Sequence, residues 1–154
     1  TDIASILKEI TVLTDKYEII KMSNSDMNFS YRYSILKENK FICLDATFEL
    51  EYKSKEEIIK LIKDRKERRV SSQPLDYPSA GSVFRNPEGD YAGRIIESLG
   101  FKGKSIGDAF VSEKHANFIV NKGRATGKDI KKLVMEIKEK VKDEGDKKWY
   151  ILNF

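Results

Sequence analysis

The sequence predicts an α+β protein made of two parts, each combining largely antiparallel strands with one or two helices. Segments of alternating hydrophobicity, which favour strands, occur in both halves of the 154-residue chain. Two longer segments carry apolar residues at spacings of three and four, as amphipathic helices do. A Ser-Ser-Gln-Pro sequence at residues 71–74 breaks the first of these helices, so the boundary between the parts is expected near residue 70.

The first part is predicted to open with a short helix at residues 2–9, where apolar residues recur at helical spacing. Residues 10–13 and 18–22 alternate like the two strands of a hairpin, and residues 41–50 form the best predicted strand. Ser54 then begins a helix with a capping box, and this helix ends in a run of basic residues.

The second part is predicted to hold a short helix at residues 92–99, stopped by Gly100, and a longer helix that begins at Thr126. Thr126 and Asp129 match a capping box. The predicted strands are residues 109–111, 116–121 and, at the end of the chain, 149–154. Neither a Rossmann glycine motif after a strand nor a P-loop motif is present, so neither kind of nucleotide site is supported.

Composition narrows the classes of function. The net charge of +4 suits a phosphate-bearing ligand, but acidic residues alternate with the lysines and argue against a nucleic acid partner. One cysteine, Cys43, and one histidine, His115, make no metal-ligand cluster, so no metal is expected. No apolar run is long enough to cross a bilayer and the first residues do not resemble a signal peptide, so a cytoplasmic chain without a membrane partner is expected.

Residues 77–87 are the first candidate site, because turn residues, small residues and polar side chains are concentrated there. Pro78 and Pro87 fix the backbone at each end, and Gly81 precedes Ser82 on the way into an apolar pair. Two interpretations are open from this pattern alone. Ser82 is either presented as a nucleophile or proton donor, or it merely caps a tight loop that enters a strand.

Five segments, in this order and spacing, resemble the UDP-N-acetylenolpyruvoylglucosamine reductases, flavoenzymes that make UDP-N-acetylmuramate for bacterial peptidoglycan and cell wall synthesis. They are residues 29–34, 67–69, 73–87, 92–97 and 111–121. The resemblance runs from about Ile3 to Val141 and fits the branch with a compact substrate domain. It implies that residues 1–70 are the carboxyl-terminal part of an FAD-binding domain and that residues 71–154 form a substrate-binding domain.

The resemblance also implies a reaction. NADPH reduces FAD, the flavin passes a hydride to the enolpyruvyl double bond, and the adjacent carbon takes a proton. Ser82 matches the family's proton donor, and Arg32 matches the arginine that holds the substrate carboxylate. A guanidinium suits this role because two parallel hydrogen bonds stabilise the enolate that hydride addition creates. Without the resemblance, Arg32 would be read as a surface ion-pair residue.

Other residues of these motifs receive expected roles from the same resemblance. The expected substrate contacts are Tyr31, Gln73, Tyr77, Arg85 and Asn86. Arg68 or Arg69 is expected to meet a phosphate of the flavin or the substrate. His115 and Asn117 are interpreted as structural residues, a packed or hydrogen-bonded histidine and an asparagine bonded to the backbone.

The chain departs from the family pattern in two ways. Family members are about twice as long, and the part that this chain does not match carries most of the flavin-binding glycine loops, so FAD is not expected to be retained. The family's catalytic glutamate near the carboxyl end has no counterpart at residues 147–154, and Glu144 is the nearest.

These departures leave two functions open, the reductase or its carboxyl-terminal part, and an inactive module that binds a UDP-sugar. Residues 1–70 would also form an unfinished sheet, so self-association, or pairing with a separate amino-terminal segment, is expected.

Overall fold

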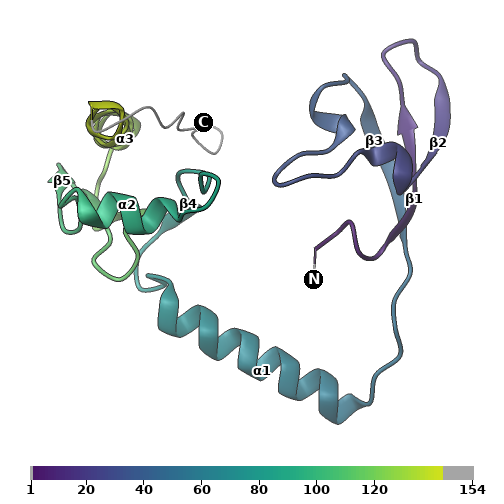
Figure 1. The fold of residues 1–154 in the computed structure, drawn as a ribbon, viewed down its shortest axis with the longest axis horizontal. Coiled ribbons are helices and arrows are strands. Elements are labelled where there is room, and N and C mark those ends of the chain that lie inside the picture. Colours follow the sequence, from purple (N-terminus) through teal and green to yellow (C-terminus); the bar gives the residue numbers. More distant parts are fainter. Residues whose placement is uncertain (1, 144–154) are drawn as a thin grey trace. The chain divides into compact units, whose positions relative to one another are not determined.

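The computed structural model describes residues 2–143 and divides the chain into two compact units, Thr1–Lys55 and Glu56–Phe154 (Figure 1). Each unit combines helical segments with an antiparallel sheet, which confirms the predicted α+β class. The proposed assignment of residues 1–70 to flavin binding and 71–154 to substrate binding is a division by role and stays a prediction. The predicted strand at residues 149–154 and the question of Glu144 lie outside the described residues.

The first unit holds a three-stranded antiparallel sheet in the order β2-β1-β3 (Figure 1). Its strands are β1 (Leu7–Leu13), β2 (Ile19–Ser23) and β3 (Ile42–Phe48). The predicted hairpin is confirmed, because β1 and β2 pair from Glu9 with Ser23 to Leu13 with Ile19. The best predicted strand is also present, as β3.

The helix predicted at residues 2–9 is wrong. A single turn, in which the Leu7 amide donates to the Ile3 carbonyl at 2.9 Å, leads directly into β1. Ile10 and Val12 then alternate toward the core, as a strand requires. The spacing of the apolar residues is compatible both with a short helix and with one helical turn followed by a half-buried strand. Pairing of β1 with two neighbouring strands favours the second arrangement.

The core of the first unit is small, and one strand lies outside it. Leu7, Ile10, Val12 and Met27 are buried, and Met27 belongs to the short 3-10 helix η1 (Ser25–Met27). A second such helix, η2 (Ile35–Lys37), supplies further apolar contacts. Every residue of β3 is exposed, apolar ones included.

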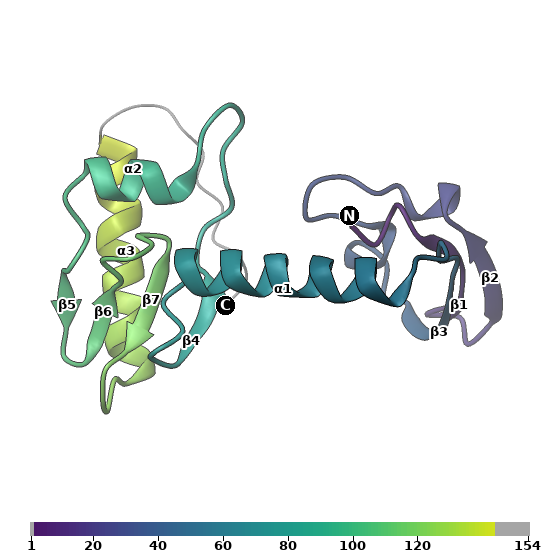
Figure 2. The same cartoon turned by 90° about the horizontal axis from the view of Figure 1, so that it is seen from below.

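The second unit begins with α1 (Lys55–Ser72), which confirms the predicted helix after Ser54. A four-stranded antiparallel sheet follows in the order β4-β7-β6-β5 (Figure 2). Its strands are β4 (Ser79–Ser82), β5 (Ser105–Ile106), β6 (Ala109–Val111) and β7 (Phe118–Asn121). The strands predicted around residues 109–111 and 116–121 are therefore confirmed.

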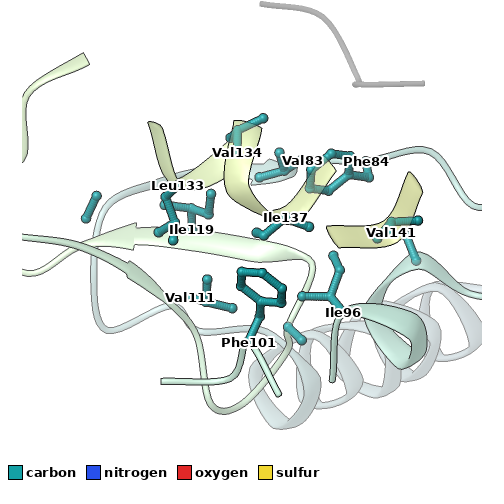
Figure 3. Close-up of a cluster of buried hydrophobic side chains, with 13 residues drawn as sticks. Val83, Phe84, Ile96, Phe101, Val111, Ile119, Leu133, Val134, Ile137 and Val141 are labelled. Atoms are coloured by element: carbon teal, nitrogen blue, oxygen red, sulfur yellow. The ribbon is translucent and has the colours of Figure 1, made fainter. Parts of the chain in front are cut away.

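Two helices, α2 (Ala92–Ser98) and α3 (Gly127–Asp143), pack with this sheet around one apolar core (Figure 2). Figure 3 shows side chains of α3, α2 and the sheet meeting in that core. The predicted capping box of α3 is confirmed, since the Thr126 amide donates to the Asp129 carboxylate at 2.8 Å and the Asp129 amide to the Thr126 hydroxyl at 3.2 Å.

The short helix α2 ends as predicted at Gly100. This glycine has φ of +74°, and the amides of Gly100 and Phe101 donate to the carbonyls of Glu97 and Ile96 at 2.9 and 3.2 Å. These two bonds form a Schellman motif, in which the left-handed position favours glycine. Phe101 then enters the core directly after the turn.

Candidate functional site

An open cleft of about 340 Å³ lies in the second unit, between the end of β4, the start of β7 and α2. Its walls come from the end of β4 and the loop after it, from α2, and from the loop before β7. The lining residues are Ser82, Asn86, Tyr91, Gly93, Arg94, Glu97, Lys114, His115, Ala116 and Asn117. The cleft therefore brings together two sequence-predicted site residues, Ser82 and Asn86.

Ser82 is the last residue of β4 and is half-buried. Its backbone position is set by the sheet, because it lies opposite Phe118 of β7. The preceding Gly81 has φ of +83°, and a Cβ there would meet nothing within 4 Å. This left-handed backbone conformation favours glycine at position 81.

The chain beyond Ser82 is tied to Asn117. The Phe84 amide donates to Asn117 Oδ1 and Asn117 Nδ2 donates to the Phe84 carbonyl, both at 2.8 Å. The Val83 amide donates to the Asn117 backbone carbonyl at 2.9 Å. The interpretation of Asn117 as a residue bonded to the backbone is thus confirmed.

His115 forms another part of the wall. Its Nδ1 accepts the Asn117 amide at 3.2 Å, and its ring centroid lies 4.9 Å from that of Phe118. Partial burial lowers its pKa below the usual 6.5, and the positive charge of Lys102 acts in the same direction. Its ring abuts α2, because a Cβ added at Gly93 would lie 3.0 Å from His115 Cε1. The interpretation of His115 as a packed, hydrogen-bonded residue is confirmed.

Asn86 joins the loop after β4 to α2, because its Oδ1 accepts the Ala92 amide at 3.1 Å. Three charged side chains, those of Arg94, Glu97 and Lys114, also line the cleft. Arg94 pairs with Asp90 one turn earlier on the chain, and Glu97 pairs with Lys102 at 2.6 Å. The site thus combines a hydroxyl, an amide, an imidazole and charges of both signs, a set suited to a polar ligand with anionic groups.

Lys114 links this wall of the cleft to α1. Its Nζ donates to the Val70 carbonyl in the last turn of α1 at 2.6 Å. A lysine at this position satisfies a carbonyl that the end of a helix leaves without an intrahelical partner.

The other predicted site residues of the second unit are not among those lining the cleft. Arg69 Nε donates to Gln73 Oε1 at 3.2 Å, so these two predicted residues contact each other at the end of α1. Arg68 lies on the same exposed helix, and its backbone carbonyl accepts hydrogen bonds from the hydroxyls of Ser71 and Ser72.

Tyr77 and Arg85 lie on either side of β4. Tyr77 precedes the strand, and Lys122 Nζ lies 5.6 Å from the centroid of its ring. Arg85 lies next to the cleft residue Asn86, and its Nε is buried without a hydrogen-bond partner among the described residues.

Tyr31 and Arg32 belong to the first unit, where both are exposed. The Arg32 guanidinium carbon lies 5.9 Å from the centre of the Tyr31 ring. Arg32 itself has φ of +59° in a tight turn closed by Ser30 and Tyr33. A non-glycine residue in this conformation is uncommon, and such residues gather at functional sites.

Sequence reasoning missed most of the cleft walls. Tyr91, Arg94, Glu97 and Lys114 were not predicted as site residues, although Arg94 and Glu97 lie in one of the resembling segments. For Arg94 and Glu97 the available signal is positional, since they stand three residues apart on α2 and so share a face.

Comparisons with known proteins agree on one family. Residues 73–147 match the family model described as "UDP-N-acetylenolpyruvoylglucosamine reductase, C-terminal domain". A curated relative of that name from Caldanaerobacter subterraneus is 46% identical over 144 residues, covering 94% of this chain and 48% of the relative. Another from Fervidobacterium nodosum is 48% identical over 135 residues, covering 86% of this chain and 44% of the relative.

A solved structure gives the same result. The crystal structure of UDP-N-acetylenolpyruvylglucosamine reductase from Thermus caldophilus matches with a TM-score of 0.81 and 34% identity, covering 95% of this chain and 52% of the other. The chain spans about half the length of the relatives that it matches. Since the family model, the relatives and the solved structure all agree, this chain is similar to the carboxyl-terminal part of the UDP-N-acetylenolpyruvoylglucosamine reductases.

Proposed function

We propose that this chain is the substrate-binding part of a flavin-dependent oxidoreductase that reduces UDP-N-acetylenolpyruvoylglucosamine to UDP-N-acetylmuramate with NADPH. The product is a precursor of peptidoglycan. The observation that carries the proposal is the position of Ser82, at the end of β4 and on the wall of a polar cleft, within the residues that match the family's carboxyl-terminal domain.

Two residues of this chain are proposed to act on the substrate. The Ser82 hydroxyl donates the proton that completes reduction of the double bond, and the sheet holds it at a fixed position. The Arg32 guanidinium holds the carboxylate and stabilises the negative charge that builds up on its oxygens. Ser82 and Arg32 belong to different units, which are each described by themselves.

Bound FAD would supply the hydride. Arg68 and Arg69, the predicted flavin-phosphate ligands, lie on the exposed helix α1, and Arg69 is engaged with Gln73. An arginine on an exposed helix is more often a solvated residue than a ligand. The roles of Arg68 and Arg69 therefore stay predictions.

Binding of the UDP-sugar can be tested on the chain itself, by calorimetry with UDP-N-acetylmuramate. Asn86→Asp keeps an oxygen that can accept the Ala92 amide but adds a negative charge to the cleft. Like charges repel, so we expect the diphosphate ligand to bind at least about tenfold more weakly. Asn121→Asp is the matched control, because Asn121 lies at the end of β7 away from the cleft. Its Oδ1 accepts hydrogen bonds from the Gly123 and Ala125 amides, and a carboxylate oxygen can accept them too. A wild-type chain that does not bind the ligand would contradict the proposal.

The role of Ser82 is tested in a protein that also carries the amino-terminal half of such a reductase. Ser82→Ala should leave UDP-sugar binding unchanged, because it keeps Cβ and removes only the hydroxyl oxygen. It should reduce turnover by about 100-fold or more, as loss of a general acid does. NADPH oxidation and isotope incorporation from deuterated water measure the two steps. Unchanged turnover would refute the assignment of Ser82 as the proton donor.

A module that binds the UDP-sugar without redox activity is the second candidate, favoured by the exposed, solvated position of Arg68 and Arg69. Mixing the purified chain with the amino-terminal half of such a reductase and FAD distinguishes the two functions. UDP-sugar binding without any NADPH oxidation in that mixture would favour the binding module.

A further inference from the structure

We infer that Asn117 is a positioning residue for the cleft, because its side chain fixes the backbone between Ser82 and Asn86. The inference rests on the proposed function, in which that segment presents the proton donor and contacts the UDP-sugar. Asn117 acts through the segment that it holds, and no contact of its own with the substrate is required.

The geometry makes the Asn117 side chain an extension of the sheet. Regular pairing of β4 with β7 ends at Ser82 opposite Phe118. The next residue, Val83, still donates to the Asn117 backbone carbonyl at 2.9 Å. At Phe84 the ladder would stop, but the carboxamide offers one acceptor and one donor at 2.8 Å each and replaces a strand residue.

The burial of this pair makes the carboxamide hard to replace. Asn117 is only 3% exposed and Phe84 only 1%, so water cannot substitute for a lost partner. An alanine at 117 would leave the Phe84 amide and carbonyl without these bonds. A carboxylate would still accept from the amide, but it would repel the carbonyl oxygen.

Phe84, the residue that the Asn117 side chain holds, lies midway between two cleft residues. Ser82 is two residues before Phe84, and Asn86 is two residues after it. Asn86 in turn accepts the Ala92 amide at the start of α2. A shift of the Phe84 backbone would therefore move the Ser82 hydroxyl, the Asn86 amide and the entry to α2 together.

The test compares Asn117→Asp with Asn117→Ala. A buried carboxyl has a raised pKa, so Asp at this position should be protonated at pH about 5 and ionised at pH about 8. When protonated, it can donate to the Phe84 carbonyl and accept from the Phe84 amide, as the carboxamide does. The raised pKa means that this contribution is present at low pH and is lost as the pH rises through the folded pKa.

Binding of UDP-N-acetylmuramate by calorimetry is the first readout. We expect Asn117→Asp to bind like the wild type at the lower pH and at least about tenfold more weakly at the higher pH, since small displacements of site groups cost that much or more. Asn117→Ala should bind weakly at both. Asn121→Asp is the matched control and should follow the wild type. The charged and titratable groups His115, Arg94, Glu97 and Lys114 line the cleft in all four proteins, so only the difference from the wild type is interpreted.

Hydrogen exchange of the Phe84 amide in the free chain is the second readout, and it needs no ligand. Its protection should fall at least about tenfold in Asn117→Ala, and in Asn117→Asp only at the higher pH. Full ligand affinity in folded Asn117→Asp at both pH values would overturn the inference, as would unchanged Phe84 protection in Asn117→Ala. If the wild type binds no UDP-sugar, the proposed function fails, and the exchange measurement alone decides whether Asn117 holds the segment.

Discussion

His115 is the only histidine of the chain, and its environment makes its titration a direct measure of the packing around the cleft. Burial and the charge of Lys102 lower its pKa in the folded unit. The folded state therefore takes up this proton less readily than the unfolded chain does. The stability that neutral His115 provides is complete above the ordinary pKa of 6.5 and is lost as the pH falls through the lower folded value.

We therefore expect the imidazole proton resonance of His115 to titrate below 6.5 and the thermal unfolding midpoint to fall with acidification in that range. His115→Gln keeps an acceptor for the Asn117 amide but cannot titrate, so the part of the pH dependence due to His115 should disappear. NMR and scanning calorimetry provide the two measurements. A titration midpoint at or above the ordinary value would show that the ring is not buried as described.

At the same scale, the sequence predicted residue types better than it predicted surroundings. Ser82 stood out because a Gly-Ser step is visible in a short segment rich in turn residues, whereas Asn86 was expected only from the family resemblance. The hydrogen bonds that tie Phe84, which lies between them, to Asn117 could not be predicted, because Phe84 and Asn117 are 33 residues apart. The left-handed backbone of Arg32 was also not predictable, since nothing in the neighbouring residue types demands it.

Among the elements, α2 and the loop before β7 constrain each other through Gly93. Alanine favours helices over glycine by up to about 1 kcal/mol, so propensity alone predicts that Gly93→Ala stabilises the unit. The added Cβ would, however, lie 3.0 Å from Cε1 and 3.3 Å from Nδ1 of His115. That ring is held by the Asn117 amide and packs against Phe118, so it cannot move freely.

We expect the clash to outweigh propensity, so that Gly93→Ala lowers the free energy of unfolding by about 1 kcal/mol. Gly127→Ala is the matched control, because a Cβ at the first residue of α3 meets nothing within 4 Å and should be neutral or slightly stabilising. Urea unfolding of the two variants gives the comparison. Equal effects of both substitutions would mean that His115 gives way and that α2 and the loop are not tightly packed.

The elements also show where periodicity is a reliable guide. The apolar residues of α3 continue over 17 residues behind a capping box, which leaves no competing interpretation. At residues 2–9 the pattern spans barely two turns, and the same residues serve one turn and a strand. Short apolar patterns are decided by the strands that pair with them, and that pairing is a tertiary property.

For the whole molecule, the feature with the widest consequences is the exposure of β3. It is an edge strand of the β2-β1-β3 sheet within residues 2–143, and all seven of its residues are exposed. Ile42, Leu44 and Phe48 are 60, 50 and 47% exposed. The sequence correctly predicted a strand within residues 41–50, but it could not show which of its side chains other residues bury. An apolar edge strand of this kind is a template for pairing with another chain.

The self-association expected from the sequence therefore stays a prediction, with β3 as its most exposed candidate surface. Leu44→Lys places a charge on the exposed strand without removing a core contact, so it should shift the chain toward monomer at a given concentration. Sedimentation velocity over a range of concentrations measures this shift. Met135→Lys, on the exposed face of α3 in the other unit, is the matched control and should leave the distribution unchanged. A wild-type chain that sediments as a monomer at every concentration would show that exposure of β3 alone does not drive association.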